Sequence, residues 1–344
     1  MRRRITSLRR LAAVLERPLA GIEQVPARLP LAITPYYASL IRRPDYDDPI
    51  FAQVVPQGAE LRRFPHLFDD PLAEDEHMPV PGLVHRYPDR ALLLATSTCA
   101  SYCRHCNRQR VAGQRRAALS PARLQQVVAY LQEHPQVRDV IVSGGDPLTM
   151  SNARLESILA ALRGVASVEI LRLGTRVPVT LPMRITGKLV AMLRRYRPLW
   201  INTQFNHPRE MTDLAAAACA RLVDAGIPLG NQTVLLRGIN DDPLLMERLC
   251  RTLVRHRVRP YYLFQCDLVQ GVEHFRTPLA RGLQILEHLR GRLGGLAIPT
   301  LAVDAAGGGG KIPLLPDYLV SREADRTLLR NWQGRLVEYP EPRE

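Results

Sequence analysis

From about residue 90 onward, short apolar runs alternate with stretches whose apolar residues recur at helical spacing. The predicted strands are the turn-bounded apolar runs at 91–98, 139–143, 168–174, 199–205, 228–235 and 260–266. Between them we expect helices at 120–133, 152–163, 186–196, 212–225 and 243–256. Ser, Thr, Asn or Asp stands at or near several of these helix starts, as in N-caps. The alternation predicts an α/β fold, a partial (βα)6 TIM-like barrel with a parallel sheet.

The two ends of the chain lack this alternation. Residues 1–75 combine an Arg/Leu-rich helical stretch, proline-punctuated segments and an acidic patch at 69–76, which we interpret as an N-terminal helical extension. The last predicted strand is followed by a helix at 279–292, an apolar run at 297–303, a glycine tract and a tail. We therefore divide the chain into an extension (1–75), a barrel (76–320) and a C-terminal tail (321–344).

Composition narrows the class of protein. With 344 residues, of which 46% are hydrophobic, the chain can fill a sizeable core. No apolar run approaches the ~18 residues of a membrane-spanning helix, so we expect a soluble cytoplasmic protein with no membrane partner. The net charge of +14 would suit a nucleic-acid partner. However, the arginines are spread along the chain without an RNA-binding motif, which favours a solvated basic surface.

Lysine is rare in this basic chain. Of the 47 basic residues, only Lys188 and Lys311 are lysines. Where arginine supplies the plain positive charge, each remaining lysine is a candidate for chemistry that arginine cannot perform, such as forming a Schiff base.

Three of the six cysteines crowd into the CxxxCxxC segment formed by Cys99, Cys103 and Cys106. A zinc site would need a second pair of ligands that the neighbouring sequence does not supply. Three thiolates instead leave one iron of a four-iron cluster (4Fe-4S) free. The spacing resembles that of radical S-adenosylmethionine enzymes, in which the free iron binds the amino and carboxyl groups of the cofactor and cluster reduction releases a 5′-deoxyadenosyl radical.

The sequence around these cysteines resembles the lysine 2,3-aminomutase family in particular. The matching stretches are Cys-Arg-His-Cys-Asn-Arg-Gln-Arg, His-Arg-Tyr-Pro-Asp-Arg before it, Ser-Gly-Gly-Asp-Pro and Gly-Asn-Gln. The resemblance implies a barrel of the radical S-adenosylmethionine type. It also implies that S-adenosylmethionine is bound by His105, Ser143, Gly144, Gly145, Asp146 and Gln232. Taken alone, a Gly-Gly-Asp segment would indicate only a tight turn.

The glycine tract at 307–310 ends in Lys311 and resembles the family's pyridoxal phosphate attachment segment. It is not a Walker A loop, because Ile312 replaces the Ser or Thr that would bind magnesium and Ala305 replaces the first glycine. The resemblance implies that Lys311 carries pyridoxal 5′-phosphate. Its phosphate would be held by Arg86, Arg90, Gly308, Gly309 and Gly310. A flexible linker is the alternative interpretation of the tract.

The resemblance also assigns the substrate contacts. Arg108 would bind the substrate carboxylate, while Asp267 and Asp304 would hold a side-chain ammonium. Two carboxylates attract a cation and repel an acidic side chain, which favours lysine over glutamate. The family's cysteine-rich zinc segment does not follow, so we expect no structural zinc, and a homodimer becomes an alternative to the family's tetramer. We expect an electron donor such as flavodoxin or ferredoxin.

The predicted activity is that of a lysine 2,3-aminomutase, an isomerase that converts L-α-lysine to β-lysine. Three alternatives remain open within or near this family: the branch that makes β-lysine for elongation factor P, an arginine 2,3-aminomutase, and a radical S-adenosylmethionine enzyme acting on RNA. A non-enzymatic iron–sulfur protein is a further alternative, and it would need Cys266 as fourth cluster ligand.

Overall fold

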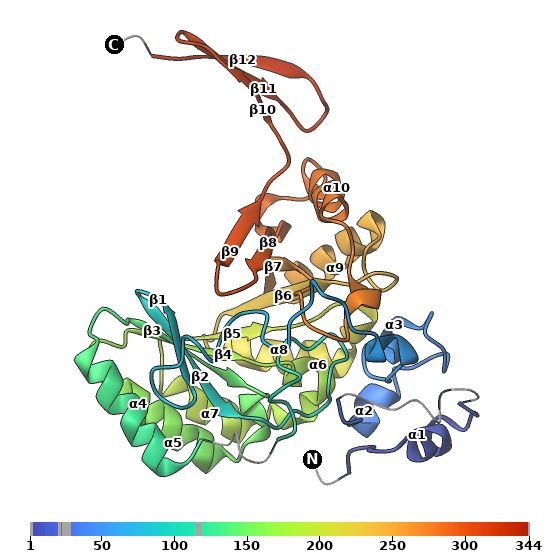
Figure 1. Ribbon diagram of the computed structural model, residues 1–344, viewed down its shortest axis with the longest axis vertical. Coiled ribbons are helices and arrows are strands. Elements are labelled where there is room, and N and C mark those ends of the chain that lie inside the picture. The colour runs from blue at the N-terminus through green and yellow to red at the C-terminus, as the bar shows by residue number, and fades with distance from the viewer. Residues whose placement is uncertain (1–2, 20–21, 23–28, 115–118, 343–344) are drawn as a thin grey trace.

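The computed structural model describes all residues except 1–2, 20–21, 23–28, 115–118 and 343–344. In this described part, a curled sheet runs from β1 to β9 in sequence order (Figure 1). Neighbours from β2 to β8 pair in parallel, whereas β1 and β9 add antiparallel edges. The strands are β1 (Leu83–Tyr87), β2 (Arg90–Thr96), β3 (Asp139–Gly144), β4 (Ile170–Gly174), β5 (Leu199–Thr203), β6 (Leu229–Leu235), β7 (Val258–Gln265), β8 (Thr300–Ala305) and β9 (Gly310–Leu314). The open order confirms the predicted partial barrel.

Helices connect the parallel strands and cover the outer face of the sheet (Figure 1). They are α4 (Pro121–Glu133), α5 (Asn152–Arg163), the short α6 (Val177–Thr180), α7 (Gly187–Arg194), α8 (Asp213–Asp224), α9 (Pro243–Arg255) and α10 (Leu279–Leu289). The predicted N-caps are confirmed, because a side-chain oxygen of each cap accepts from the backbone N–H three residues on. These caps are Ser120, Ser151, Thr186, Thr212 and Asp242.

Strand β3 illustrates how the sheet separates core from site. Val140 and Val142 are fully buried in the main hydrophobic cluster, which they share with the covering helices. Asp139, Ile141 and Ser143 alternate with them and line a cavity on the opposite face. Because successive side chains of a strand point to opposite faces, the same strand builds the core and presents polar groups to the cavity.

In the described part of the N-terminal segment, the α-helices α1 (Leu8–Leu15), α2 (Pro35–Ala38) and α3 (Pro49–Ala52) lie beside one end of the sheet (Figure 1). It is tied to the barrel by buried polar contacts, including a hydrogen bond of 2.6 Å from the Tyr37 hydroxyl to Glu210. The proposed boundary at residue 76 stays a prediction.

Strands outside the six predicted βα units were not predicted. They are the edge strands β1 and β9, the parallel strand β8, which the sequence analysis described only as an apolar run, and a second, antiparallel sheet. This second sheet consists of β10 (Leu319–Arg322), β11 (Arg326–Arg330) and β12 (Leu336–Pro340) and stands apart from the barrel in Figure 1. Most of it lies in the region 321–344, which the sequence analysis described as a tail. Within the described residues, no helix is long and apolar enough to cross a membrane.

Candidate active site

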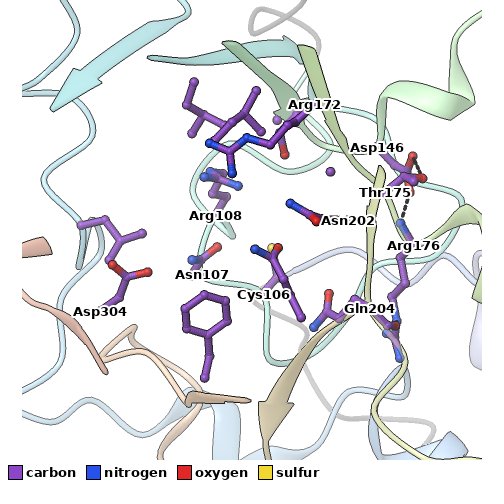
Figure 2. Close-up of a pocket in the computed structure, with 18 of the residues that line it drawn as sticks. Cys106, Asn107, Arg108, Asp146, Arg172, Thr175, Arg176, Asn202, Gln204 and Asp304 are labelled. Atoms are coloured by element: carbon purple, nitrogen blue, oxygen red, sulfur yellow. Dashed lines mark hydrogen bonds between the residues drawn. The ribbon is translucent and has the colours of Figure 1, made fainter. Parts of the chain in front are cut away.

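A cavity of about 560 Å³ lies on the inner face of the curled sheet, a volume in the range of small-molecule sites (Figure 2). It extends from loops at the carboxyl ends of the strands to Arg90 at the start of β2 and Arg172 within β4. Among the predicted site residues, it is lined by Cys99, Cys103, Cys106, Lys311, Arg86, Arg90, His105, Ser143, Gly144, Gly145, Asp146, Gln232, Arg108, Asp267 and Asp304. The structure thus brings together residues up to 225 positions apart in the chain, such as Arg86 and Lys311.

The cysteine loop after β2 is fixed by the N-terminal segment. Arg4 donates from Nη1 to the carbonyl of Cys99 at 2.7 Å, and the backbone N–H of Tyr102 donates to Ala32 at 2.9 Å. Arg104, which follows Cys103 in the chain, is completely buried, and its guanidinium makes two hydrogen bonds to Glu60. The extension therefore orders the loop that carries the thiols.

All three thiols of this loop are free and partly buried. Burial and the neighbouring Cys103 raise the pKa of Cys106 to about 11, and burial with the charge of Asp146 raises the pKa of Cys99 well above its ordinary value. Among the described residues, no three His, Cys, Asp or Glu side chains are arranged to hold one metal ion. A four-iron cluster binds each thiolate through a different iron, so its ligands need only face a common space.

The Gly-Gly-Asp segment that ends β3 packs tightly against the chain after β2. A Cβ at Gly144 would lie 2.4 Å from the carbonyl oxygen of Thr96, and Gly144 has a φ of +107°. Asp146 accepts from Thr175 Oγ1 at 2.6 Å and from the backbone N–H of Arg176 at 2.7 Å (Figure 2). Burial raises the pKa of Asp146, and these hydrogen bonds oppose that effect. Close packing alone therefore explains both glycine and aspartate at this turn.

Lys311 and two aspartates lie on the other side of the cavity. Lys311 Nζ donates to Asp304 Oδ2 at 2.7 Å, and the guanidinium of Arg86 contacts Asp304 Oδ1 at 3.4 Å. Asp267 accepts from the amide of Asn107 at 2.7 Å. Burial and the charge of Asp304 raise the pKa of Asp267 to about 7. Asp267 is thus a partly buried carboxyl that would gain from a bound cation.

A cationic region lines the deep end of the cavity. Arg90 stacks on the ring of Tyr87, with its guanidinium carbon 3.8 Å from the ring centroid, and Arg86 lies 4.9 Å from the same ring. Arg172 also faces the cavity and donates from Nε to Asp139 at 2.8 Å. These arginines can bind an anion such as a phosphate.

The predicted phosphate-binding glycines are the only predicted site residues that do not line the cavity. Gly308, Gly309 and Gly310 do not line the cavity: Gly308 and Gly309 lie in the turn between β8 and β9, and Gly310 is the first residue of β9. A Cβ at Gly308 would lie 2.6 Å from the ring of His77, and one at Gly310 would lie 3.1 Å from the hydroxyl of Tyr87. Tight packing and positive φ values of +78° and +82° at these two residues explain the glycines without a ligand.

Arg108 is held by an acidic partner that the sequence analysis left unassigned. Its Nε and Nη2 donate to Glu74 Oε1 at 2.8 and 2.7 Å. Glu74 is only 3% exposed. Burial alone would raise the pKa of Glu74, but the guanidinium of Arg108 brings it below its ordinary value. Both residues line the cavity, so this ion pair belongs to the site.

Comparison with known proteins identifies the family of this chain. The profile described as "Radical SAM superfamily" matches residues 93–248, and the profile "Lysine-2,3-aminomutase" matches residues 286–344. The L-lysine 2,3-aminomutase of Clostridium subterminale is 52% identical over 322 residues, which cover 94% of this chain and 77% of that protein. This chain belongs to the lysine 2,3-aminomutase family. It is therefore an isomerase, which excludes the non-enzymatic alternative.

Other members of the lysine 2,3-aminomutase family show how far membership fixes the substrate. The L-lysine 2,3-aminomutase of Bacillus subtilis is 46% identical, covering 99% of this chain and 72% of that protein. The glutamate 2,3-aminomutase of Clostridioides difficile is 44% identical, covering 97% and 79%. Relatives with different named substrates match at similar identity, so family membership alone does not identify the substrate amino acid.

The residues of this family member fit the family's cofactors: a 4Fe-4S cluster, S-adenosylmethionine and pyridoxal phosphate. Three free thiols face one cavity, and their buried thiolates would be stabilised by iron. The nearly unique Lys311 reaches the same cavity, close to arginines able to hold a phosphate. The cavity is large enough for bound cofactor and substrate groups to approach one another.

Sequence reasoning missed several residues that shape the aminomutase cavity, namely Glu74, Asn107, Arg172, Arg176, Asn202 and Gln204. Arg176 donates from Nη1 to Cys103 Sγ at 2.8 Å and also pairs with buried Glu210. Arg172 carried one usable signal, because a charged residue alternates with leucines in a predicted strand and must face something polar. Glu74 carried no such signal.

Proposed function

We propose that this chain converts L-lysine to β-lysine, moving the amino group from Cα to Cβ while a hydrogen atom moves from Cβ to Cα. The supporting observation is that Asp267 and Asp304 line the same cavity as Arg108. A cation at one position and two carboxylates at another complement an amino acid with a cationic side chain. The same carboxylates would repel the side chain of glutamate.

The chain's own residues would divide the work as follows. Arg108 binds the substrate carboxylate and fixes the orientation of the amino acid. Asp267 holds the side-chain ammonium, and the raised pKa of Asp267 favours a cationic partner at this position. Asp304 accepts from Lys311 in the substrate-free structure, so a substrate ammonium would share or replace that contact.

The cofactors would be held by separate parts of the cavity. Cys99, Cys103 and Cys106 would bind the cluster, and Lys311 with Arg86 and Arg90 would bind pyridoxal phosphate. S-adenosylmethionine would lie against His105, Ser143, Gly144, Gly145, Asp146 and Gln232. When bound, the cluster and S-adenosylmethionine supply a hydrogen-abstracting radical, and pyridoxal phosphate supplies the carbonyl carbon that bonds the substrate amine.

An anaerobic substrate panel tests the proposal. Enzyme reconstituted with iron, sulfide and pyridoxal phosphate is given S-adenosylmethionine, dithionite and either lysine, arginine or glutamate, and products are identified by mass spectrometry. We expect β-lysine from lysine and no product from glutamate. Faster conversion of arginine would establish the arginine alternative, and no product from lysine in fully loaded enzyme would refute the proposal.

The remaining expectations concern the enzyme's partners. Use of β-lysine for elongation factor P, an electron donor such as flavodoxin or ferredoxin, and assembly as a homodimer stay predictions. Replacing dithionite with reduced flavodoxin or ferredoxin in the same assay tests the donor.

A further inference from the structure

Glu74 lies in a buried turn that contacts two cavity-lining arginines and the glycine tract. Its carboxylate binds Arg108, while two neighbours in the same segment use backbone carbonyls. Leu72 accepts from Arg86 Nη1 at 3.3 Å, and Pro71 accepts from the backbone N–H of Gly307 at 3.0 Å. The turn is therefore held at both the anion-binding arginines and the glycine tract, which fixes where the Glu74 carboxylate can be.

The Glu74 carboxylate occupies only one edge of the Arg108 guanidinium. A guanidinium has five N–H donors, and the Nε and Nη2 side is the edge that faces Glu74. Within the described residues, Nη1 of Arg108 has no hydrogen-bond partner in the protein. The Arg108 side chain is 19% exposed and lines the cavity. The free edge, made of Nη1 and the second N–H of Nη2, can thus donate two parallel hydrogen bonds to a carboxylate.

A second arginine, Arg110, also contacts the Glu74 carboxylate, but at a longer distance than Arg108 does. Arg110 Nη1 lies 3.5 Å from Glu74 Oε2, but Arg110 makes shorter contacts of 2.9 and 3.0 Å to Asp70 and Asp75. Arg110 is therefore already neutralised by the same turn. Glu74 remains committed to Arg108.

We propose that Glu74 is a positioning residue for substrate recognition: it holds the Arg108 guanidinium so that the free edge meets the α-carboxylate of the amino acid. This inference rests on the proposed role of Arg108. The alternative is that Glu74 imitates the substrate carboxylate and must be displaced. The geometry opposes that alternative, because Glu74 and a substrate carboxylate would use different edges of one guanidinium and can bind together.

Equilibrium binding tests the proposal without turnover. Titration calorimetry on enzyme loaded with iron–sulfur cluster and pyridoxal phosphate, without S-adenosylmethionine, compares L-lysine with 1,5-diaminopentane, which has both amines and no carboxylate. Wild type should prefer lysine. Glu74→Ala should lower the lysine affinity by about 10- to 100-fold, the range found for partners that orient metal ligands, and leave the diamine affinity unchanged. Glu74→Gln keeps the shape and one acceptor, so its lysine affinity should lie between those of wild type and Glu74→Ala.

Two further variants separate positioning from general damage. Asp75→Ala removes an exposed carboxylate from the same turn that pairs with Arg110 alone, and lysine affinity should stay within about twofold of wild type. In an Arg108→Ala background, Glu74→Ala should cause no additional loss, because the two residues act as one unit.

Three results would overturn the inference: tighter lysine binding in Glu74→Ala, equal losses for lysine and the diamine, or no preference for lysine in wild type. Failure of the proposed function would look different. Wild type would then prefer the carboxylate-bearing ligand but release no β-lysine in the activity assay.

Discussion

Replacing Asp267 with asparagine should stabilise the folded protein while damaging substrate binding. The carboxyl is partly buried and near Asp304, and together its burial and this charge raise the pKa of Asp267 from 3.8 to about 7. That difference corresponds to a cost of about 4 kcal/mol in the folded state once the carboxyl is ionised. Asparagine keeps the shape and can still accept from Asn107, whose amide lies 2.7 Å away. Asp267→Asn therefore removes a charge that the nearby cations Lys311 and Arg108 offset only in part.

The stability difference between Asp267→Asn and wild type depends on pH. Below about pH 4 the carboxyl is protonated in both the folded and the unfolded chain, so Asp267→Asn should be neutral. Between about pH 4 and 7 only the unfolded chain loses the proton, so wild type loses stability as the pH rises. Above about pH 7 the loss is complete. The variant should then exceed wild type by up to about 4 kcal/mol.

Thermal unfolding of substrate-free protein at pH 5 and pH 8.5, with matched iron content, measures this difference. We expect a gain of about 5 °C or more at pH 8.5 and a much smaller gain at pH 5. Lysine KM should rise at least about 10-fold, since the ammonium loses a charged partner. Asp139→Asn is the matched control, because Asp139 pairs with Arg172 at 2.8 Å and its loss should not stabilise. Equal stability of wild type and Asp267→Asn at pH 8.5 would refute the reasoning.

Three other substitutions test separate parts of the site. Cys103→Ser should abolish the visible absorbance and iron content of the cluster, whereas Cys266→Ser should retain both; loss of iron in Cys266→Ser would show that Cys266 is a ligand. Lys311→Ala should remove the visible absorbance of bound pyridoxal phosphate, and exposed Lys188→Ala should not. Glu60→Gln leaves the fully buried Arg104 without its charged partner, so denaturant unfolding should show a loss of about 3–5 kcal/mol, accompanied by faster loss of iron.

Six of the seven parallel strands and their helices could be predicted because local sequence determines them. A strand such as β3 has buried valines facing the helices, and a helix such as α5 has a Ser cap followed by leucines at helical spacing. The missed strands lack such signals. Strand β9 is short and contains Pro313, and it exists because its backbone pairs antiparallel with β8. Strand β12 is exposed throughout, so no apolar alternation identified it.

The candidate site likewise contains some residues that could be predicted from the sequence and others that could not. The thiols and Lys311 could be identified because their chemistry needs specific residue types at specific spacing. The Glu74–Arg108 pair could not, because two oppositely charged residues 34 positions apart are common in any chain. Two glycines of the tract, Gly308 and Gly310, are required by the close approach of His77 and Tyr87, which sequence alone does not reveal.

The pairing of carboxylates around the cavity explains why one of them is the best candidate for binding a substrate cation. Most lining carboxylates within the described residues contact a cationic side chain of the protein: Glu74 with Arg108, Asp89 with Arg90, Asp139 with Arg172 and Asp304 with Lys311. Asp146 instead accepts from Thr175 and a backbone N–H, whereas Asp267 accepts only from neutral Asn107. A partly buried carboxyl with no cation in direct contact costs stability, and such a cost is expected where a ligand supplies the missing charge. The same imbalance that should make Asp267→Asn more stable would therefore make wild type bind a cationic amino acid.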